Sequence, residues 1–278
     1  MRAPSTVYIN LLFLILLFFV PAFSPSNEIW NNLDDGLDVA RFSLNELSED
    51  SSITIVRINP KDWNLKILSI SETGASRGHS AREWCEKHNL TAAINGGMFD
   101  IDYKTHIGYM KSYEHINSSR RNKYLSAAAF DPFGDDSPLF KIFDLDEVSL
   151  DTLIANYNCV IQNLRLIKRN RENRWEPRIR KWAEVALAED FAGNALFIFC
   201  SEQVTMYEFN ERLLALPINI ITAQHLEGGI QAQLYLKNGD YEVNLSGDFS
   251  TGISINNQEG LVSQLPNVIG IYPRDKND

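Results

Sequence analysis

The hydrophobic pattern of the chain is mostly that of β-strands: short runs with an apolar residue at every second position, separated by Gly, Pro, Asn and Asp. Three pairs of runs flank a short turn and predict β-hairpins, at residues 52–58 with 65–70, 182–188 with 195–200, and 231–237 with 240–245. The turn of the third pair is Asn238-Gly239, a dipeptide typical of two-residue hairpins. Single strands are also predicted at residues 90–95, 124–130, 159–167 and 268–272.

Two predicted helices begin at capping boxes, in which a Ser or Thr and the Glu three residues later bond each other's backbone amides. Ser80 and Glu83 open one at residues 81–88, and Thr205 and Glu208 open the other, which Pro217 ends. Residues 146–157 have the apolar spacing of a third helix. Strands in hairpins outnumber helices, and no linker divides residues 51–275. The sequence therefore predicts a single α+β domain with a largely antiparallel or mixed β-sheet and packed helices.

The first 50 residues are predicted to lie outside that domain. Residues 1–26 contain one cation, Arg2, an apolar run from Leu11 to Val20, and small residues before position 27. Ten helical residues rise only about 15 Å, so a cleaved signal peptide is expected, with an uncleaved membrane anchor as the alternative. Export predicts a periplasmic or extracellular protein, which meets a membrane only through this segment and only if the segment stays uncleaved. Residues 27–50 are acidic and weakly patterned, and a lead-in that packs only partly is expected.

The charge of the chain excludes one class of partner. Its formal net charge is -10 at pH 7, and it has no zinc-finger, helix-turn-helix or RNA-binding motif. Non-specific binding to nucleic acid needs a basic face, so no nucleic-acid partner is expected. Residues 165–181 reverse the balance locally, with eight Lys and Arg against two Glu. This basic stretch is either a solvated loop or a source of positive potential for an anionic ligand.

Two polar loops follow apolar runs and contain paired glycines. The first runs from Asn95-Gly96-Gly97 through Asp100 and Asp102, and the second is Ala223-Gln224-His225-Leu226-Glu227-Gly228-Gly229. Without a Cβ, glycine lets the backbone approach a ligand and turn its amides toward an anion. Two such loops predict two walls of one site, although each glycine pair taken alone also fits a tight turn.

These motifs together resemble the phosphodiester glycosidase family, which includes the mannose-6-phosphate uncovering enzyme. The resemblance rests, in chain order, on Asn95-Gly96-Gly97-Met98-Phe99, the strands at 185–190 and 197–199, the helix at 205–216, and Leu226-Glu227-Gly228-Gly229. It covers roughly residues 53–272 and looks closest to an exported bacterial branch. It implies a hydrolase of the glycosidase type, which cleaves a sugar 1-phosphodiester into the sugar and a phosphomonoester. The family's usual second motif has Asp before the glycines and Ser after them, where this chain has Glu227 and Ile230.

The resemblance and the chemistry of glycosyl transfer suggest roles for residues of both loops. Cleavage through an oxocarbenium-like transition state needs a carboxylate near the anomeric carbon. Glu227 is the predicted nucleophile or general base, Asp100 the second carboxylate, and His225 a general acid or phosphate ligand. The predicted substrate-binding residues are Asn95, Gly96, Gly97, His106, Asn163, Arg165, Gly228 and Gly229, with Arg165 binding phosphate through a bidentate contact.

Other interpretations of these residues stay open. Glu227 can be a turn carboxylate that caps the glycine amides, and His225 a structural histidine at a strand end. Asp100 and Asp102, together with Glu227, offer the clustered oxygens that bind Ca²⁺ or Mg²⁺, the only cofactors that the sequence suggests. A function of another class is a non-catalytic exported cell-envelope protein that binds a carbohydrate or sugar phosphate without turnover.

Overall fold

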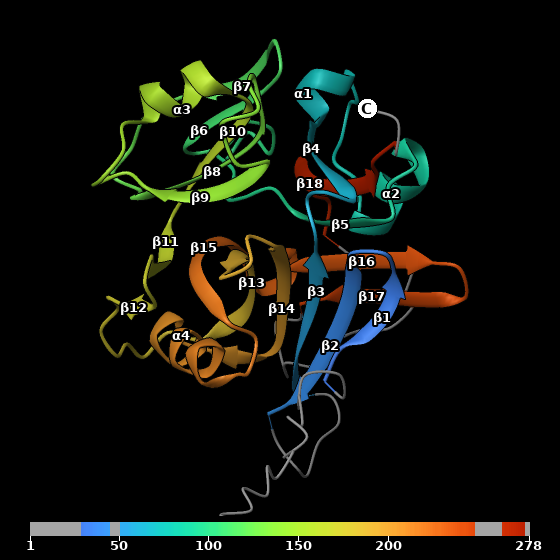
Figure 1. Cartoon of the computed structure of the whole chain (residues 1–278), viewed down its shortest axis with the longest axis vertical. Coiled ribbons are helices and arrows are strands. Elements are labelled where there is room, and N and C mark those ends of the chain that lie inside the picture. Colours follow the sequence, from blue (N-terminus) through green and yellow to red (C-terminus); the bar gives the residue numbers. More distant parts are fainter. Residues whose placement is uncertain (1–28, 45–50, 248–262, 276–278) are drawn as a thin grey trace, which may run out of the picture.

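The computed structural model of the chain describes residues 29–44, 51–247 and 263–275 (Figure 1). The predicted export segment at 1–26 lies outside these residues. Within the described ranges, no helix combines the length and the apolar composition that crossing a membrane requires.

The strands of the described residues form three sheets in which neighbouring strands run antiparallel. The large sheet has the order β1 (Asn31–Asp34), β2 (Leu37–Ser43), β3 (Ser52–Ile58), β14 (Ala195–Val204), β13 (Trp182–Asp190), β15 (Ile220–Gly228), β11 (Arg165–Lys168) and β12 (Glu172–Asn173). The second sheet has the order β7 (His115–Ser119), β6 (Tyr109–Ser112), β10 (Tyr157–Asn163), β8 (Ser126–Pro132) and β9 (Phe140–Asp144). The third has the order β17 (Tyr241–Ser246), β16 (Gln233–Asn238), β5 (Ala92–Asn95), β18 (Asn267–Pro273) and β4 (Trp63–Ser69).

The helices of the described residues are short. They are α1 (Ile70–Thr73), α2 (Ala81–His88), α3 (Leu150–Asn156), α4 (Met206–Ala215) and the 3₁₀ turn η1 (Gly229–Gln231). Helix α4 packs on the large sheet, α3 on the second sheet and α2 on the third, each through its own apolar cluster. Figure 1 shows the large sheet with α4 in the lower part of the molecule, and α3 and α2 on opposite sides of the upper part.

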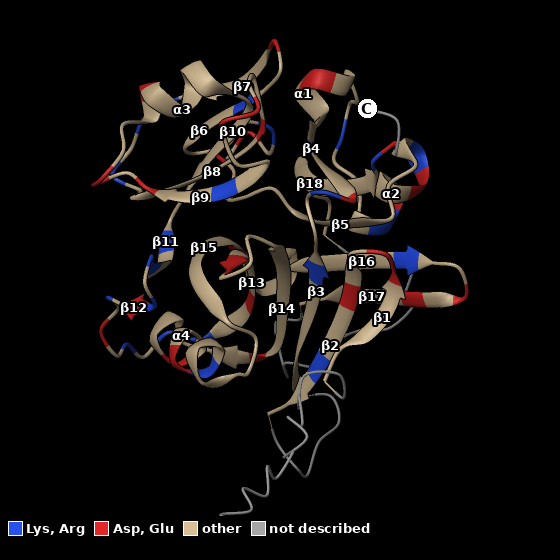
Figure 2. Cartoon of the chain, in the orientation of Figure 1, with Lys and Arg blue, Asp and Glu red and all other residues tan. Residues whose placement is uncertain are grey.

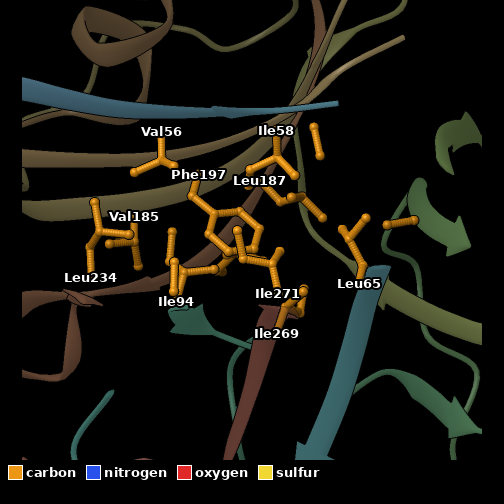
Figure 3. Packing of buried hydrophobic residues seen from close by; sticks show 14 of the residues in the cluster. Val56, Ile58, Leu65, Ile94, Val185, Leu187, Phe197, Leu234, Ile269 and Ile271 are labelled. Carbon is orange, nitrogen blue, oxygen red and sulfur yellow. The ribbon is translucent and has the colours of Figure 1, made fainter. Parts of the chain in front are cut away.

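The main core lies where the inner faces of the three sheets meet. Figure 3 shows Phe197 of β14 among aliphatic side chains of β3, β13, β5, β16 and β18. Phe197 and Ile94 are completely buried, as are Ala128 and Ile161 of the second sheet, which belong to the same cluster. Burial of one such large side chain contributes roughly 1.5–3 kcal/mol. All three sheets therefore stabilise one another, and the α+β fold with antiparallel sheets is confirmed.

Several local predictions are confirmed by the structure. Both capping boxes form, at Ser80 with Glu83 and at Thr205 with Glu208. Strands β13 and β14 pair as a hairpin, and so do β16 and β17, whose turn places Gly239 at a φ of +56°. These features depend on residues close in the sequence, which is why the sequence pattern contains them.

Two strand predictions are wrong, and both errors concern which strands pair. Strand β3 does not form a hairpin with β4: it pairs with β2 and β14, whereas β4 pairs with β18 in the third sheet. The predicted strand at 159–167 is two strands in different sheets, β10 and β11, which meet at Leu164. The acidic segment before residue 51 was expected to pack only partly, but it supplies β1 and β2 at the edge of the large sheet, with Leu37 completely buried.

Candidate functional site

A pocket of about 690 Å³ opens where four segments meet at one end of the large sheet. The first glycine loop contributes Met98 and Tyr103, and the second contributes the end of β15 and η1. The start of β13 and the turn that leads into α4 complete the wall. The lining residues are Met98, Tyr103, Arg180, Lys181, Trp182, Gln203, Met206, His225, Glu227, Gly228, Gly229, Ile230 and Gln231. Both predicted loops therefore contribute to the same pocket.

An irregularity in strand pairing aims the polar residues of β15 into this pocket. Val185 pairs with Glu227 and Ala186 pairs with His225, so three residues of β15 oppose two of β13. Such a bulge twists a strand locally and re-aims its side chains. On β13, Trp182 and Glu184 are two positions apart, the spacing that places side chains on one face of a strand.

His225 lines the pocket and forms a buried pair with Glu184, which is not among the lining residues. Nδ1 of His225 is hydrogen-bonded to Oε1 of Glu184, and Nε1 of Trp182 donates to Oε2 of the same carboxylate. Burial lowers the pKa of His225, but the Glu184 carboxylate outweighs it, so the pKa lies above 6.5. Burial raises the pKa of Glu184. Both shifts favour a proton on the pair, and Nε2 is the ring nitrogen of His225 that does not bond Glu184.

Glu227 is the carboxylate that lines the pocket itself. It is half-buried, and one of its oxygens accepts a 3.1 Å hydrogen bond from the Gly228 amide. Burial raises its pKa, with Glu184 acting in the same direction and His225 opposing it. A carboxylate and a histidine whose pKa values are both raised suit general acid–base chemistry.

We expect the stability of the protein to fall as the pH rises above about 6.5, and Glu184→Gln to remove much of this dependence. Because the pKa of His225 is raised from 6.5 by folding, the folded chain binds more protons than the unfolded chain in this range. The slope approaches at most about 1.4 kcal/mol per pH unit for one proton. In the variant, burial still lowers the pKa of His225, and of the two carboxylates that raise it only Glu227 remains. Thermal unfolding between pH 6 and 9 measures the slope.

The exposed Glu86 on α2 supplies the control for this measurement. Glu86→Gln removes one carboxylate that pairs only with Arg82 on the same helix, with 55 % of its side chain exposed. It should leave the pH slope as in the unmodified protein. Equal slopes in all three proteins would contradict a folding-linked proton at the His225 and Glu184 pair.

Two other predicted site residues, His106 after the first loop and Asn163 at the end of β10, form a second, inner polar cluster around Gly97. His106 is completely buried, and its Nε2 lies 2.8 Å from the Gln162 carbonyl oxygen. Burial lowers the pKa of His106 to about 4. Nδ2 of Asn163 donates to the Gly96 carbonyl over 3.1 Å. These side chains fix the shape of the glycine turn, and none of them is among the residues that line the pocket.

Asn95 joins the two loops directly. Its Nδ2 donates to the Gln231 carbonyl over 2.6 Å, and its Oδ1 accepts from the Gln233 amide over 2.8 Å. Asn95 is 1 % exposed. Because both ends of its amide are bonded to the backbone after the second loop, Asn95 positions the pocket wall and is not one of the pocket-lining residues.

Asp100 and Asp102 do not take the positions that the sequence suggested. The Arg120 guanidinium beside Asp100 lowers the pKa of that carboxyl, and Asp102 accepts hydrogen bonds from the Lys104 and Thr105 amides. Neither residue lines the pocket with Glu227. In the part of the chain that the structure describes, no group of three or more His, Cys, Asp or Glu is arranged to hold a metal ion. The arrangement of Asp100 as second carboxylate, or of Asp100 and Asp102 as metal ligands with Glu227, is therefore not found.

The basic stretch divides into a paired part and a part at the pocket. Arg165 contacts Asp144 and Asp146, each at 3.0 Å, and only 11 % of its side chain is exposed, so the predicted phosphate contact does not fit its position. Figure 2 shows acidic and basic residues beside one another around β11 and β12. Arg180 and Lys181, at the end of the stretch, line the pocket. These two cations, and not Arg165, are placed to attract an anionic ligand.

Sequence reasoning missed Glu184 and Trp182. Both lie in a strand that reads as an apolar run, and their partner His225 is 41 positions away along the chain. A single charged residue inside a buried apolar strand was the available signal, because an ionised side chain is rarely buried without a partner.

The fold and pocket define a class: an antiparallel α+β protein whose pocket combines a carboxylate, a buried His–Glu pair and two cations. The sequence profile of the phosphodiester glycosidase family matches residues 88–272, and the chain belongs to this family. No curated protein sequence matches the chain.

Two solved structures share the fold over most of the chain. The catalytic domain of zebrafish N-acetylglucosamine-1-phosphodiester alpha-N-acetylglucosaminidase, auto-inhibited by pro-peptide, has a TM-score of 0.63 and 14 % identity, and the match covers 86 % of this chain and 84 % of that one. A hypothetical protein from Synechocystis has a TM-score of 0.60 and 12 % identity, over 88 % of this chain and 63 % of that one. At these identities the similarity shows a common fold.

Proposed function

We propose that the protein hydrolyses a sugar 1-phosphodiester in this pocket. The observation that supports this proposal is that one cavity is lined or adjoined by a carboxylate, a buried histidine–glutamate pair and two cations. These residues are Glu227, the pair of His225 and Glu184, and Arg180 with Lys181. The family supplies the reaction type, and the names of its relatives supply the substrate class. From the predicted export segment at residues 1–26 we also propose that this reaction takes place outside the cytoplasm.

The proposed reaction uses one water and breaks one bond. Glu227 removes a proton from water, whose oxygen attacks the anomeric carbon, and the bond between that carbon and the phosphate oxygen breaks. The bonding electrons leave with the phosphate oxygen, and Nε2 of His225 donates a hydrogen bond or a proton to it. The products are the free sugar and a phosphomonoester. A phosphate is already a good leaving anion, so one carboxylate in the pocket suffices.

We expect release of free sugar from an N-acetylglucosamine 1-phosphodiester by the purified protein. Free reducing sugar and phosphomonoester should appear in equal amounts, and a panel that varies the sugar and the aglycone identifies the substrate. Protein unfolded by heat is the control. A folded sample that is inactive on the whole panel, with and without Ca²⁺ or Mg²⁺, would contradict the proposal; retention of a sugar phosphate by the same sample would then support the non-catalytic binding protein.

A further inference from the structure

The pocket contains an arginine stacked on a tryptophan, and the proposed reaction gives the tryptophan no role. The guanidinium carbon of Arg180 lies 5.5 Å from the centre of the Trp182 ring, and both residues line the pocket. A pair of the same kind, Arg57 over Trp30 at 4.1 Å, lies outside the pocket-lining residues. The pair of Arg57 and Trp30 can therefore serve as a control for the pair in the pocket.

The indole of Trp182 is held in one orientation. Its Nε1 donates to the buried carboxylate of Glu184, and the backbone of Gly228 packs against its five-membered ring. A Cβ at Gly228 would come within 2.3 Å of the Trp182 Cδ1 atom. Rotation of the ring would break this hydrogen bond and leave Oε2 of the buried Glu184 carboxylate without its donor, which is unfavourable. Trp182 is thus a rigid apolar surface at the wall of the pocket.

Of the two cations that line the pocket, Arg180 has the charged group with fewer partners. Lys181, the next residue, forms an ion pair with Glu208 at 3.0 Å. Arg180 is exposed, and among the described residues no carboxylate forms an ion pair with it. A guanidinium binds phosphate oxygens through two parallel hydrogen bonds. An arginine that rests on an aromatic ring can exchange that stack for a phosphate contact.

We infer that Trp182 is the platform on which the sugar ring stacks and that Arg180 binds the adjoining phosphate. This inference rests on the proposed function for the class of ligand. The apolar C–H face of a pyranose matches the flat indole, which presents a large apolar area with little loss of side-chain entropy. When the sugar occupies the ring face, the guanidinium leaves it and meets the anion next to the sugar. The pair thereby selects sugar phosphates over free sugars and over free phosphate.

Calorimetric titration of three probes separates the two halves of this subsite. The probes are N-acetylglucosamine, inorganic phosphate and N-acetylglucosamine 1-phosphate, added to the full-length protein. Trp182→Ala should weaken binding of both sugar-containing probes about 3- to 10-fold and leave inorganic phosphate unaffected. Arg180→Gln should weaken both phosphate-containing probes about 10-fold and leave the free sugar unaffected.

Two further variants keep the test decisive if Trp182→Ala does not fold. Trp182→Phe retains an aromatic face without the Nε1 donor. This variant should bind the sugar more tightly than Trp182→Ala. If Trp182→Ala does not fold, the affinity of Trp182→Phe for the sugar should lie within a few-fold of that of the unmodified protein. Arg57→Gln is the matched control, because it breaks the stack on Trp30 outside the pocket and should leave all three affinities unchanged.

Three outcomes would overturn the inference. They are unchanged sugar affinity in folded Trp182 variants including Trp182→Ala, unchanged phosphate affinity in Arg180→Gln, and binding of none of the probes at millimolar concentration by the unmodified protein. Equal weakening of all probes by Trp182→Ala, together with a lowered melting temperature, would indicate a purely structural residue. Selective binding through Trp182 and Arg180 without cleavage of any phosphodiester would leave this inference standing and remove the proposed function.

Discussion

Glu227→Gln is expected to reduce hydrolysis of a sugar phosphodiester on the order of 10³-fold or more, because it removes the one carboxylate among the described pocket-lining residues. The amide has nearly the same shape but cannot accept a proton from water. Affinity for N-acetylglucosamine 1-phosphate should survive, since Arg180 and Trp182 are untouched. Steady-state kinetics and calorimetric titration of the same protein sample measure the two effects separately.

The same variant should fold with nearly unchanged stability. Burial raises the pKa of Glu227, which means that the folded state disfavours its charge, so the neutral amide relieves this penalty above the unfolded pKa of 4.5. The hydrogen bond from the Gly228 amide can pass to the amide oxygen of the variant. Urea unfolding at pH 7 should place the variant within about 1 kcal/mol of the unmodified protein, or above it.

Asp100→Asn is the comparison that separates the two carboxylates suggested by the sequence. Asp100 pairs with Arg120 outside the lining of the pocket, so its loss should cost far less activity than that of Glu227. If Asp100→Asn lost as much turnover as Glu227→Gln, the result would indicate that Asp100 takes part in catalysis. Full turnover in Glu227→Gln would remove the proposed mechanism.

The site residues that the sequence predicted best are those that lie together in one short motif. Glu227 and His225 could be identified as candidates because a polar pair precedes two glycines at a strand end. Arg165 had the right chemistry for phosphate but is bound by Asp144 and Asp146, which lie about twenty positions earlier in another segment. The position of a charged residue in the sequence does not indicate which residue of opposite charge it will pair with in the fold. Candidates chosen by residue type alone therefore include some whose charge is neutralised by an ion pair.

The same limit explains the errors in the fold. The alternating pattern on both sides of residues 59–62 predicted two strands correctly, but alternation does not choose a strand's partner. Strand β3 is buried at six of its seven positions, so it requires neighbours on both sides, which β2 and β14 provide. Glu184 was missed for a related reason: its function depends on the pairing of β13 with β15, a contact between strands far apart in the chain.

Gly97→Val is expected to destabilise the protein by about 3 kcal/mol or more. Gly97 has a φ of +153°, a conformation that residues with side chains rarely adopt, and a Cβ there would lie 2.3 Å from Oδ1 of Asn163 and 2.6 Å from Cε1 of His106. The inner polar cluster thus occupies the space that a side chain at Gly97 needs. Urea unfolding measures the change in the free energy of unfolding.

The neighbours of Gly97 cannot withdraw, which is why the effect should be large. Asn163 and His106 are completely buried and are held by hydrogen bonds to the backbone at Gly96 and Gln162. Moving either side chain breaks one of these bonds in a region closed to water, and the freed group then lacks a partner. A collision with an exposed, flexible side chain would be relieved at little expense, so burial decides the magnitude here.

Gly134→Val is the matched control for this prediction. Nothing lies within 4 Å of a Cβ at Gly134, so the branched side chain should change stability by less than about 0.5 kcal/mol. Gly97→Ala isolates the effect of a single Cβ and should already account for much of the loss. If Gly97→Ala is as stable as the unmodified protein, the first loop can shift away from Asn163 and His106, and the cluster does not fix the shape of the wall that carries Met98 and Tyr103 into the pocket.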